Sequence, residues 1–432
     1  MSKISNFKFQ ISNFVRHPLF TGSAVMIVGS NFSNFLAFTY HLIIGRLLGP
    51  SSYGDLASVI SLSAMFSAVF TFIGTVIIKF VSSAKNKKEL TAILSWFTKK
   101  TFIVSIVFFI IIIFLSPAFS NFLHVENKII LLLPVFLSFS VMSLVLRSYL
   151  QGLLKFIETT VSLNIEFLLR LILGVLFVYV GWSVFGAVLG IAMSGIIGFF
   201  VTLFFLKDFN IFSNSKEVGL SSKIFAYSLP VFLFSLATTS FLTTDTILAK
   251  HFLNSHDAGI YASLSTLGKI ILYASGPVGI VMFPMVSKRF SMGQSYIKIF
   301  LLSLLLTVGI SLSVLFVYQL FPTFAIRVLY GEGFVEGQKY LIWFGLFAAA
   351  FTLSSLISSF YLSIGKIKVV VLPIFFAILQ IIGIILFHDS ILTIILVSFA
   401  TSVILFLSLL LYFGYETHFG NNSRLQGGEV HR

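Results

Sequence analysis

The sequence predicts an all-α polytopic membrane protein with twelve transmembrane helices in two six-helix lobes. Composition, a series of long apolar runs and an internal repeat carry this prediction. Of the 432 residues, 58% are hydrophobic and 10% are charged, whereas a soluble domain is about 25% charged. So few charges cannot cover a water-facing surface, which excludes disordered, collagen-like, coiled-coil and nucleic-acid-binding chains. The absence of cysteine excludes disulfides, thiolate metal sites and thiol catalysis.

Twelve apolar runs are each long enough to cross a bilayer, which takes about 20 residues. The first run lacks a small-residue cleavage site after it, so we expect a retained helix rather than a signal peptide. Proline and glycine interrupt some runs, as at Pro230 and Gly276, which is tolerated where neighbouring helices or a cavity satisfy the backbone. The runs cover residues 20–45, 56–78, 101–118, 129–150, 159–180, 184–206, 225–249, 260–285, 299–321, 340–363, 369–387 and 390–412.

Lysine and arginine are distributed unevenly between the two sides of these runs. Of the 28 such residues, 20 fall on one side and five on the other. The positive-inside rule therefore places both termini, 79–100 and 207–224 in the cytoplasm of a cell with this protein in its plasma or inner membrane. The segments 46–55, 251–258 and 322–339 then face outward. The same asymmetry explains most of the +14 net charge, so no basic surface for a partner is needed.

An internal repeat relates the two halves. The segment Gly45–Ser58 after the first run matches Ala249–Ser263 after the seventh in a small residue, a cation, an apolar pair and a Gly-x-x-Ala-Ser sequence. A period of six helices makes both halves enter from the same side, related by a pseudo-two-fold axis along the membrane normal. We therefore expect an N-terminal lobe over 1–206, a cytoplasmic linker over 207–223, a C-terminal lobe over 224–412 and a cytoplasmic tail over 413–432.

The segment Arg46-Leu47-Leu48-Gly49-Pro50-Ser51-Ser52-Tyr53-Gly54 carries a family resemblance. It resembles the R-x-LGP-x-x-YG segment of the polysaccharide and O-antigen flippase branch of the multidrug/oligosaccharidyl-lipid/polysaccharide (MOP) exporter superfamily. The segments 245–262 and 329–334 resemble its second-half features. The resemblance implies two lobes around a central cavity that moves a lipid-linked glycan by alternating access.

Charged residues inside the runs are the candidate functional residues, since a charge at the bilayer centre costs about 2.5–3.5 kcal/mol on insertion scales. Glu166 and Arg170 lie four residues apart on one helical face. They form either a self-neutralised structural pair or a cavity-lining cation that Glu166 tunes. Arg147 shares a helical face with serines near the cytoplasmic end of its run. It is either a snorkelling side chain or a substrate contact.

In the second half, Lys269 lies about two turns inside its run, and Asp245 lies at similar depth on the preceding run. The two residues are close enough in depth to pair across helices. We expect Lys269, Arg170 and Arg147 to line one water-accessible cavity between the lobes. Glu166 and Asp245 are then coupling or charge-pairing groups.

Four further residues near the outer half of the membrane complete the candidates. Arg46 and Lys250 occupy matching positions of the repeat, where each is either an interfacial anchor or a substrate contact. Asn34 and His41 share one face of the first helix. Asn34 is a candidate substrate contact. His41 is a candidate coupling group because imidazole titrates near neutral pH, although packing histidines are commoner.

The remaining motifs exclude several chemistries. Gly365-Lys366 has no phosphate loop before it, no His-Glu-x-x-His sequence occurs, and the histidines form no metal-ligand pattern. We therefore expect no enzyme activity, no cofactor and no metal. The expected partners are a lipid-linked oligosaccharide, the bilayer and glycan polymerases or glycosyltransferases, with the chain itself a monomer.

Three alternatives remain open from the sequence. A multidrug cation antiporter of the same superfamily would show an acidic cavity, whereas the deep charges are mainly basic. A membrane glycosyltransferase or glycan polymerase would need a larger exported loop with catalytic residues. A channel or structural membrane protein fits the repeat and the broken helices less well.

Overall fold

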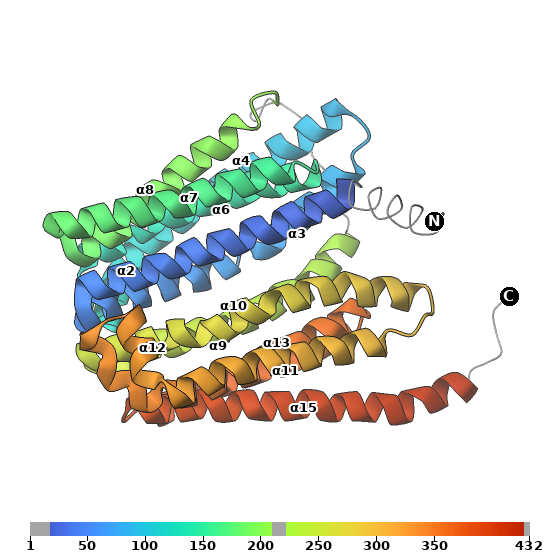
Figure 1. The fold of residues 1–432 in the computed structure, drawn as a ribbon. Helices are drawn as coiled ribbons and strands as arrows, with labels where there is room; N and C mark the ends of the chain where they lie inside the picture. Colours follow the sequence, from blue (N-terminus) through green and yellow to red (C-terminus); the bar gives the residue numbers. More distant parts are fainter. Residues whose placement is uncertain (1–17, 210–221, 427–432) are drawn as a thin grey trace, which may run out of the picture. The chain divides into compact units, whose positions relative to one another are not determined.

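The computed structural model describes residues 18–209 and 222–426, and this part of the chain is helical with no strand. It divides into two compact units, one within residues 1–232 and one within residues 233–432. In each unit the long helices run alongside one another (Figure 1). The predicted linker 207–223 and tail 413–432 lie largely or partly outside the described residues, and their roles stay predictions.

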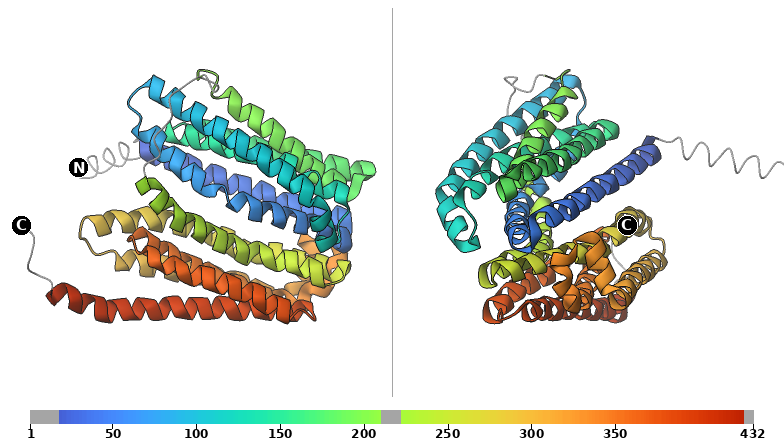
Figure 2. Two further views of the ribbon diagram at one scale, coloured as in Figure 1. Left: turned by 180° about the vertical axis from the view of Figure 1, so that it is seen from behind. Right: turned by 60° about the vertical axis from the view of Figure 1, so that its left-hand side comes forward.

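The long helices of the first unit alternate in direction along the chain (Figures 1 and 2). Helix α2 packs on α7, α7 on α8, and α6 on α3, α4 and α8. A core of apolar side chains from α3, α4 and α6 includes Ile77, Leu94 and Leu146. The helices are α2 (Pro18–Ala68), α3 (Thr71–Ser83), α4 (Lys87–Leu123), α5 (Asn127–Ile130), α6 (Leu133–Gly152), α7 (Phe156–Phe177), a π-helical turn (Val178–Trp182) and α8 (Ser183–Phe204).

The second unit also consists of long helices joined by short connections, and its first helix, α9, begins before the boundary at residue 233. Helix α13 is its centre, because α10, α11 and α15 all pack against it. A capped start at Asn254, whose side chain accepts from the Asp257 N–H at 2.9 Å, separates α10 from α9. The helices are α9 (Ser222–Phe252), α10 (Ser255–Ser291), α11 (Ile297–Leu320), α12 (Pro322–Leu329), a 3-10 helix (Glu332–Gly337), α13 (Gln338–Ser363), a 3-10 helix (Ile367–Val370), α14 (Val371–Leu386) and α15 (Ile391–Gln426).

Two glycines change the chain direction inside continuous helical stretches. Gly49, followed by Pro50, has φ 72°, and Gly181 has φ 99°, a region that a residue with a side chain rarely adopts. Among the described residues, nine helices are long and apolar enough to cross a membrane, or ten if the bent pair of α2 and α3 is one span. Each glycine lies within a stretch that covers two predicted spans. The count of twelve, and the pseudo-two-fold axis, stay predictions.

In the first unit the described turns that are predicted to be cytoplasmic lie at one end. In the first unit the turns 84–86, 153–155 and 205–209 lie at the end where α4 begins and α8 finishes (Figure 1). The Lys87 ammonium lies 5.8 Å from the centre of the Phe209 ring and joins these two helix ends. The opposite end carries the turns 124–132 and 178–183. The loops predicted on the same side of the membrane therefore lie at the same end of this unit, as the positive-inside rule requires.

Single cysteines introduced into this cysteine-free chain test the orientation. We expect Ser215→Cys to react with a membrane-permeant thiol reagent only, and Ser52→Cys to react with an impermeant reagent added outside intact cells. The reason is the 20-to-5 asymmetry of Lys and Arg between the two sides. Labelling of Ser215→Cys from outside alone would overturn both the orientation and the two-lobe arrangement.

The helices α7 and α8 approach each other closely enough to exclude a methyl group. A Cβ atom on Gly190 would lie 2.6 Å from the backbone nitrogen of Gly174 and 2.8 Å from its Cα. Since backbone atoms cannot move aside cheaply, we expect Gly190→Ala to lower the stability by about 3 kcal/mol, the upper end of overpacking effects. A fall of several degrees in the melting temperature in detergent checks this. Gly309→Ala, where the Cβ meets nothing within 4 Å, is the matched control, and equal melting temperatures for both variants would refute the close approach.

Candidate functional site

Two arginines share one carboxylate in the interior of the first unit. Arg147 Nη2 on α6 donates to Glu166 Oε2 on α7 at 2.7 Å. Arg170 Nη2, one turn further along α7, lies 3.5 Å from the other oxygen, Glu166 Oε1. The side chains of Arg147, Glu166 and Arg170 are only 12%, 6% and 14% exposed. The structure therefore brings together the three charged residues that the sequence places inside the membrane runs of this half.

One carboxylate cannot neutralise two guanidiniums, so the Arg147–Glu166–Arg170 cluster carries a net charge of +1. Arg147 and Arg170 are also close enough to repel each other. Glu166 makes its shorter contact with Arg147, which makes Arg170 the less compensated cation. The Arg170 guanidinium lies 4.6 Å from the centre of the Phe167 ring and 5.5 Å from that of Phe136. In the described part of the chain its Nε is a buried donor with no hydrogen-bond partner.

The surrounding helices fix this cluster in place. Arg147 Nε donates to Ser162 Oγ at 3.1 Å, and its Nη2 donates to the Ser162 carbonyl oxygen at 3.2 Å. Helix α8 packs directly against Glu166, because a Cβ on Gly198 would lie 2.8 Å from Glu166 Oε2. Glu166 is fixed in position, and arginine N–H groups beside it remain available as donors. Such charged donors are suited to binding an anion.

The second unit holds a buried carboxylate with a different environment. Asp245 on α9 is fully buried. Its Oδ2 accepts from the Tyr261 hydroxyl on α10 at 2.8 Å, and its Oδ1 accepts from the Thr246 N–H at 2.7 Å. Lys269, two turns further along α10 than Tyr261, interacts electrostatically with Asp245. Whether the two side chains pair directly stays a prediction.

The two cations at matching positions of the repeat differ in their surroundings. Lys250, near the end of α9, is only 2% exposed, and its Nζ donates to Ser255 Oγ at 3.3 Å. Arg46 on α2 is exposed. The matched sequence positions thus do not have matched environments, and whether either residue contacts a substrate stays a prediction.

The candidate polar residues of α2 differ in their exposure. Asn34 is exposed, whereas His41 is half-buried with its Nδ1 3.0 Å from the Tyr53 hydroxyl. Ser33, beside Asn34, is buried and donates to Asn164 Oδ1 on α7 at 2.5 Å. His41 thus has a hydrogen-bond partner, and Asn34 is accessible. The roles of both residues stay predictions.

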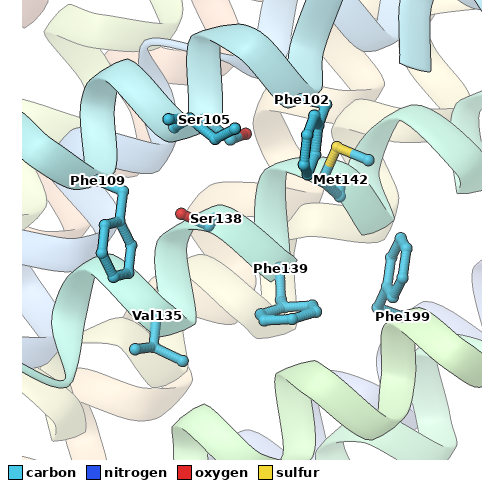
Figure 3. Close-up of a pocket in the computed structure, with 9 residues that line it drawn as sticks. Phe102, Ser105, Phe109, Val135, Ser138, Phe139, Met142 and Phe199 are labelled. Atoms are coloured by element: carbon cyan, nitrogen blue, oxygen red, sulfur yellow. The ribbon is translucent and has the colours of Figure 1, made fainter. Parts of the chain in front are cut away.

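A pocket of about 410 Å³ lies between α4, α6 and α8 of the first unit. Figure 3 shows Phe102, Phe109, Phe139 and Phe199 around it, with the hydroxyls of Ser105 and Ser138 at its edge. None of the charged candidates lines it, so this pocket is suited to hydrocarbon rather than to a phosphate. No group of three or more His, Asp or Glu side chains that could hold a metal ion occurs within 18–209 and 222–426.

Neutral residues hold the charges in place, and the sequence does not reveal them. Ser162 on α7 accepts two hydrogen bonds from Arg147 on α6, one at its hydroxyl and one at its carbonyl oxygen. Tyr261 lies in the repeat segment but was not assigned to Asp245. The available signal was helical spacing, which reports residues on one helix and gives no partner on the next.

A family model described as "Polysaccharide biosynthesis protein" matches residues 19–290, more than half of the chain. The chain therefore belongs to this family, which confirms the resemblance drawn from the sequence. A curated relative is an uncharacterized membrane protein of Methanocaldococcus jannaschii, 24% identical over 282 residues, which covers 62% of this chain and 67% of the relative.

Two solved structures have a similar fold. An inward-facing multidrug resistance MATE family transporter of the MOP superfamily gives a TM-score of 0.74 at 14% identity, over 90% of this chain and 96% of that chain. The inward closed conformation of the lipid II flippase MurJ gives a TM-score of 0.70 at 17% identity, over 90% of this chain and 87% of that chain. The all-α membrane fold predicted from the sequence is thus confirmed.

Proposed function

We propose that this chain is a flippase that moves a polyprenyl-(pyro)phosphate-linked oligosaccharide from the inner to the outer leaflet of the plasma membrane. Both termini stay in the cytoplasm, and the exported glycan serves cell-surface polysaccharide synthesis. Membership of the polysaccharide biosynthesis family supports a transporter of this kind. The transported headgroup is polar, so it cannot cross hydrocarbon unless protein groups replace its hydration.

The single observation that carries the proposal is the net positive charge of the Arg147–Glu166–Arg170 cluster. A diphosphate is anionic, and an arginine fork binds phosphate oxygens with two parallel hydrogen bonds. Arg170 keeps a buried Nε without a partner in the described residues. Its side chain is 14% exposed, so a ligand has access to part of it. We assign Arg170 as the phosphate contact, with Arg147 beside it. The Glu166 carboxylate partly neutralises the two guanidiniums.

Lys269 has the corresponding role in the second unit, with Asp245 as its charge-pairing group. Arg46, Lys250 and Asn34 are secondary contacts on the cargo's route. No nucleotide site is expected, so the energy comes from an ion gradient, the membrane potential or consumption of the glycan outside. Glu166, Asp245 and His41 are the groups able to couple to protons. In this proposal the chain acts as a monomer. Glycan polymerases or glycosyltransferases receive the exported cargo.

The main alternative is a multidrug cation antiporter, since MATE family transporters have a similar fold. A cation binding site needs surplus acidic charge. In the first unit the buried cluster has two cations and one anion, which favours an anionic cargo.

Deletion of the gene tests this function in the cell. We expect loss of the surface glycan and accumulation of the lipid-linked oligosaccharide in the inner leaflet, because glycan synthesis continues while export stops. Both changes should be reversed by the wild-type chain. Unchanged surface glycan together with raised sensitivity to cationic drugs would favour the antiporter instead.

A further inference from the structure

A second pocket in the second unit has a chemistry unlike that of the charged clusters. It has a volume of about 270 Å³ and lies between α10, α11 and α13. Five hydroxyl side chains line it and no charged residue does. The hydroxyls are those of Ser275, Thr307, Thr352, Ser355 and Ser359.

Two of these hydroxyls are buried without a partner. Ser275 is 4% exposed and Thr307 is 1% exposed. Within the described residues neither Ser275 Oγ nor Thr307 Oγ1 has a hydrogen-bond partner. Lipid chains cannot supply one, and an unmet hydroxyl in an apolar medium is unfavourable. The pocket is therefore built for water or for a ligand that carries hydroxyl groups.

The other walls of the pocket fit a ring with an apolar face. Phe283 and Ile280 line the pocket, and both are partly exposed. Gly276 leaves part of the α10 side open, since a Cβ at this position would meet nothing within 4 Å. Small-molecule sites are usually lined by apolar side chains together with a few polar groups. A sugar ring has hydroxyl groups at its edge and C–H groups on its faces, which matches both kinds of wall.

We propose that this pocket is a subsite for one uncharged saccharide ring of the cargo, separate from the arginine cluster that binds phosphate. The proposal rests on the proposed function, since it assumes a glycan cargo. The volume is slightly below the about 300 Å³ of the smallest ordinary ligand pockets, so it takes one ring rather than an oligosaccharide. When no cargo is present, water fills the pocket, since each water needs only about 30 Å³.

Cysteine labelling tests whether the pocket is wet. Ser275→Cys and Thr307→Cys in membrane vesicles should react with a charged, water-soluble methanethiosulfonate reagent. The control is Ser311→Cys, which is equally buried on α11 but replaces a hydroxyl already bonded to the Thr307 carbonyl oxygen at 2.8 Å. We expect the two pocket cysteines to react at least about 10-fold faster than the control. Equal rates would overturn the proposal, whatever the cargo is.

Filling the pocket with a large side chain tests whether it binds the cargo. Gly276→Phe fills it, whereas Gly309→Phe adds the same ring at another helical glycine with open space, outside the pocket. We expect Gly276→Phe to lower surface glycan at least about 10-fold and Gly309→Phe to leave it within about two-fold, at equal protein levels. Fast labelling together with normal export by Gly276→Phe would show a pocket that holds water alone and would overturn the subsite.

These results separate the subsite from the proposed function. If deletion of the gene leaves the surface glycan unchanged, the glycan cargo is wrong and the saccharide assignment fails with it. If deletion and Arg170→Ala both stop export but Gly276→Phe does not, the flippase stands and only the subsite fails.

Discussion

Replacing Arg170 with alanine should lower export of the lipid-linked glycan at least about 100-fold while the protein stays in the membrane. The change removes two charge-assisted hydrogen bonds to phosphate, each worth about 1.5–3 kcal/mol, and 1.4 kcal/mol corresponds to a factor of ten. Arg170→Lys should recover about a tenth of the activity, because an ammonium makes no bidentate contact. The measurement is surface glycan per molecule of membrane-inserted protein.

Two controls separate phosphate binding from a structural role for Arg170. Arg327→Ala removes an arginine that pairs with Glu332 at 2.7 Å but is 56% exposed, so export should stay within about two-fold. The double variant Glu166→Gln with Arg170→Ala keeps Arg147 and removes the charge that Arg170 balances. Full export by this double variant would show that Arg170 serves only to neutralise Glu166.

The single change Glu166→Gln has the largest expected effect on stability. It leaves Arg147 and Arg170 together in the interior without their carboxylate. Breaking a buried ion pair by removing one partner costs about 3–5 kcal/mol. We therefore expect little folded protein, measured as the monodisperse fraction after detergent extraction. The double change Arg147→Met with Glu166→Gln removes one charge of each sign and should restore most of the folded fraction. A folded fraction of Glu166→Gln equal to that of the wild type would contradict the shared-carboxylate arrangement.

The composition and the apolar runs predicted the helical membrane fold because hydropathy reports directly on the surrounding solvent. They do not report how consecutive helices join. The runs 20–45 and 56–78 predict two helices, and in the structure these form the two arms of α2 (Pro18–Ala68), which meet at a non-helical kink at Gly49. A positive φ at a single glycine changes the direction of the chain without changing its hydropathy.

For the site, the sequence predicted the charges but only part of their pairing. The spacing of Glu166 and Arg170 on α7 indicated one contact, at 3.5 Å in the structure. The shorter contact, at 2.7 Å, comes from Arg147 on another helix, 19 residues earlier in the chain. Helical periodicity cannot report it, because it depends on how α6 packs against α7. The same limit hid Tyr261 as the partner of Asp245.

The central claim is that the chain moves an anionic lipid-linked glycan across a membrane. The most direct measurement uses purified protein in liposomes that contain a polyprenyl-diphosphate-linked oligosaccharide, with an impermeant glycosidase added outside. In protein-free liposomes about half of the oligosaccharide, the outer-leaflet share, should be cleaved. The wild-type chain should make nearly all of it cleavable, and the Arg170→Ala chain should give the protein-free value. Cleavage that stops at the protein-free value with correctly folded wild-type protein, under an imposed ion gradient and membrane potential, would contradict the account.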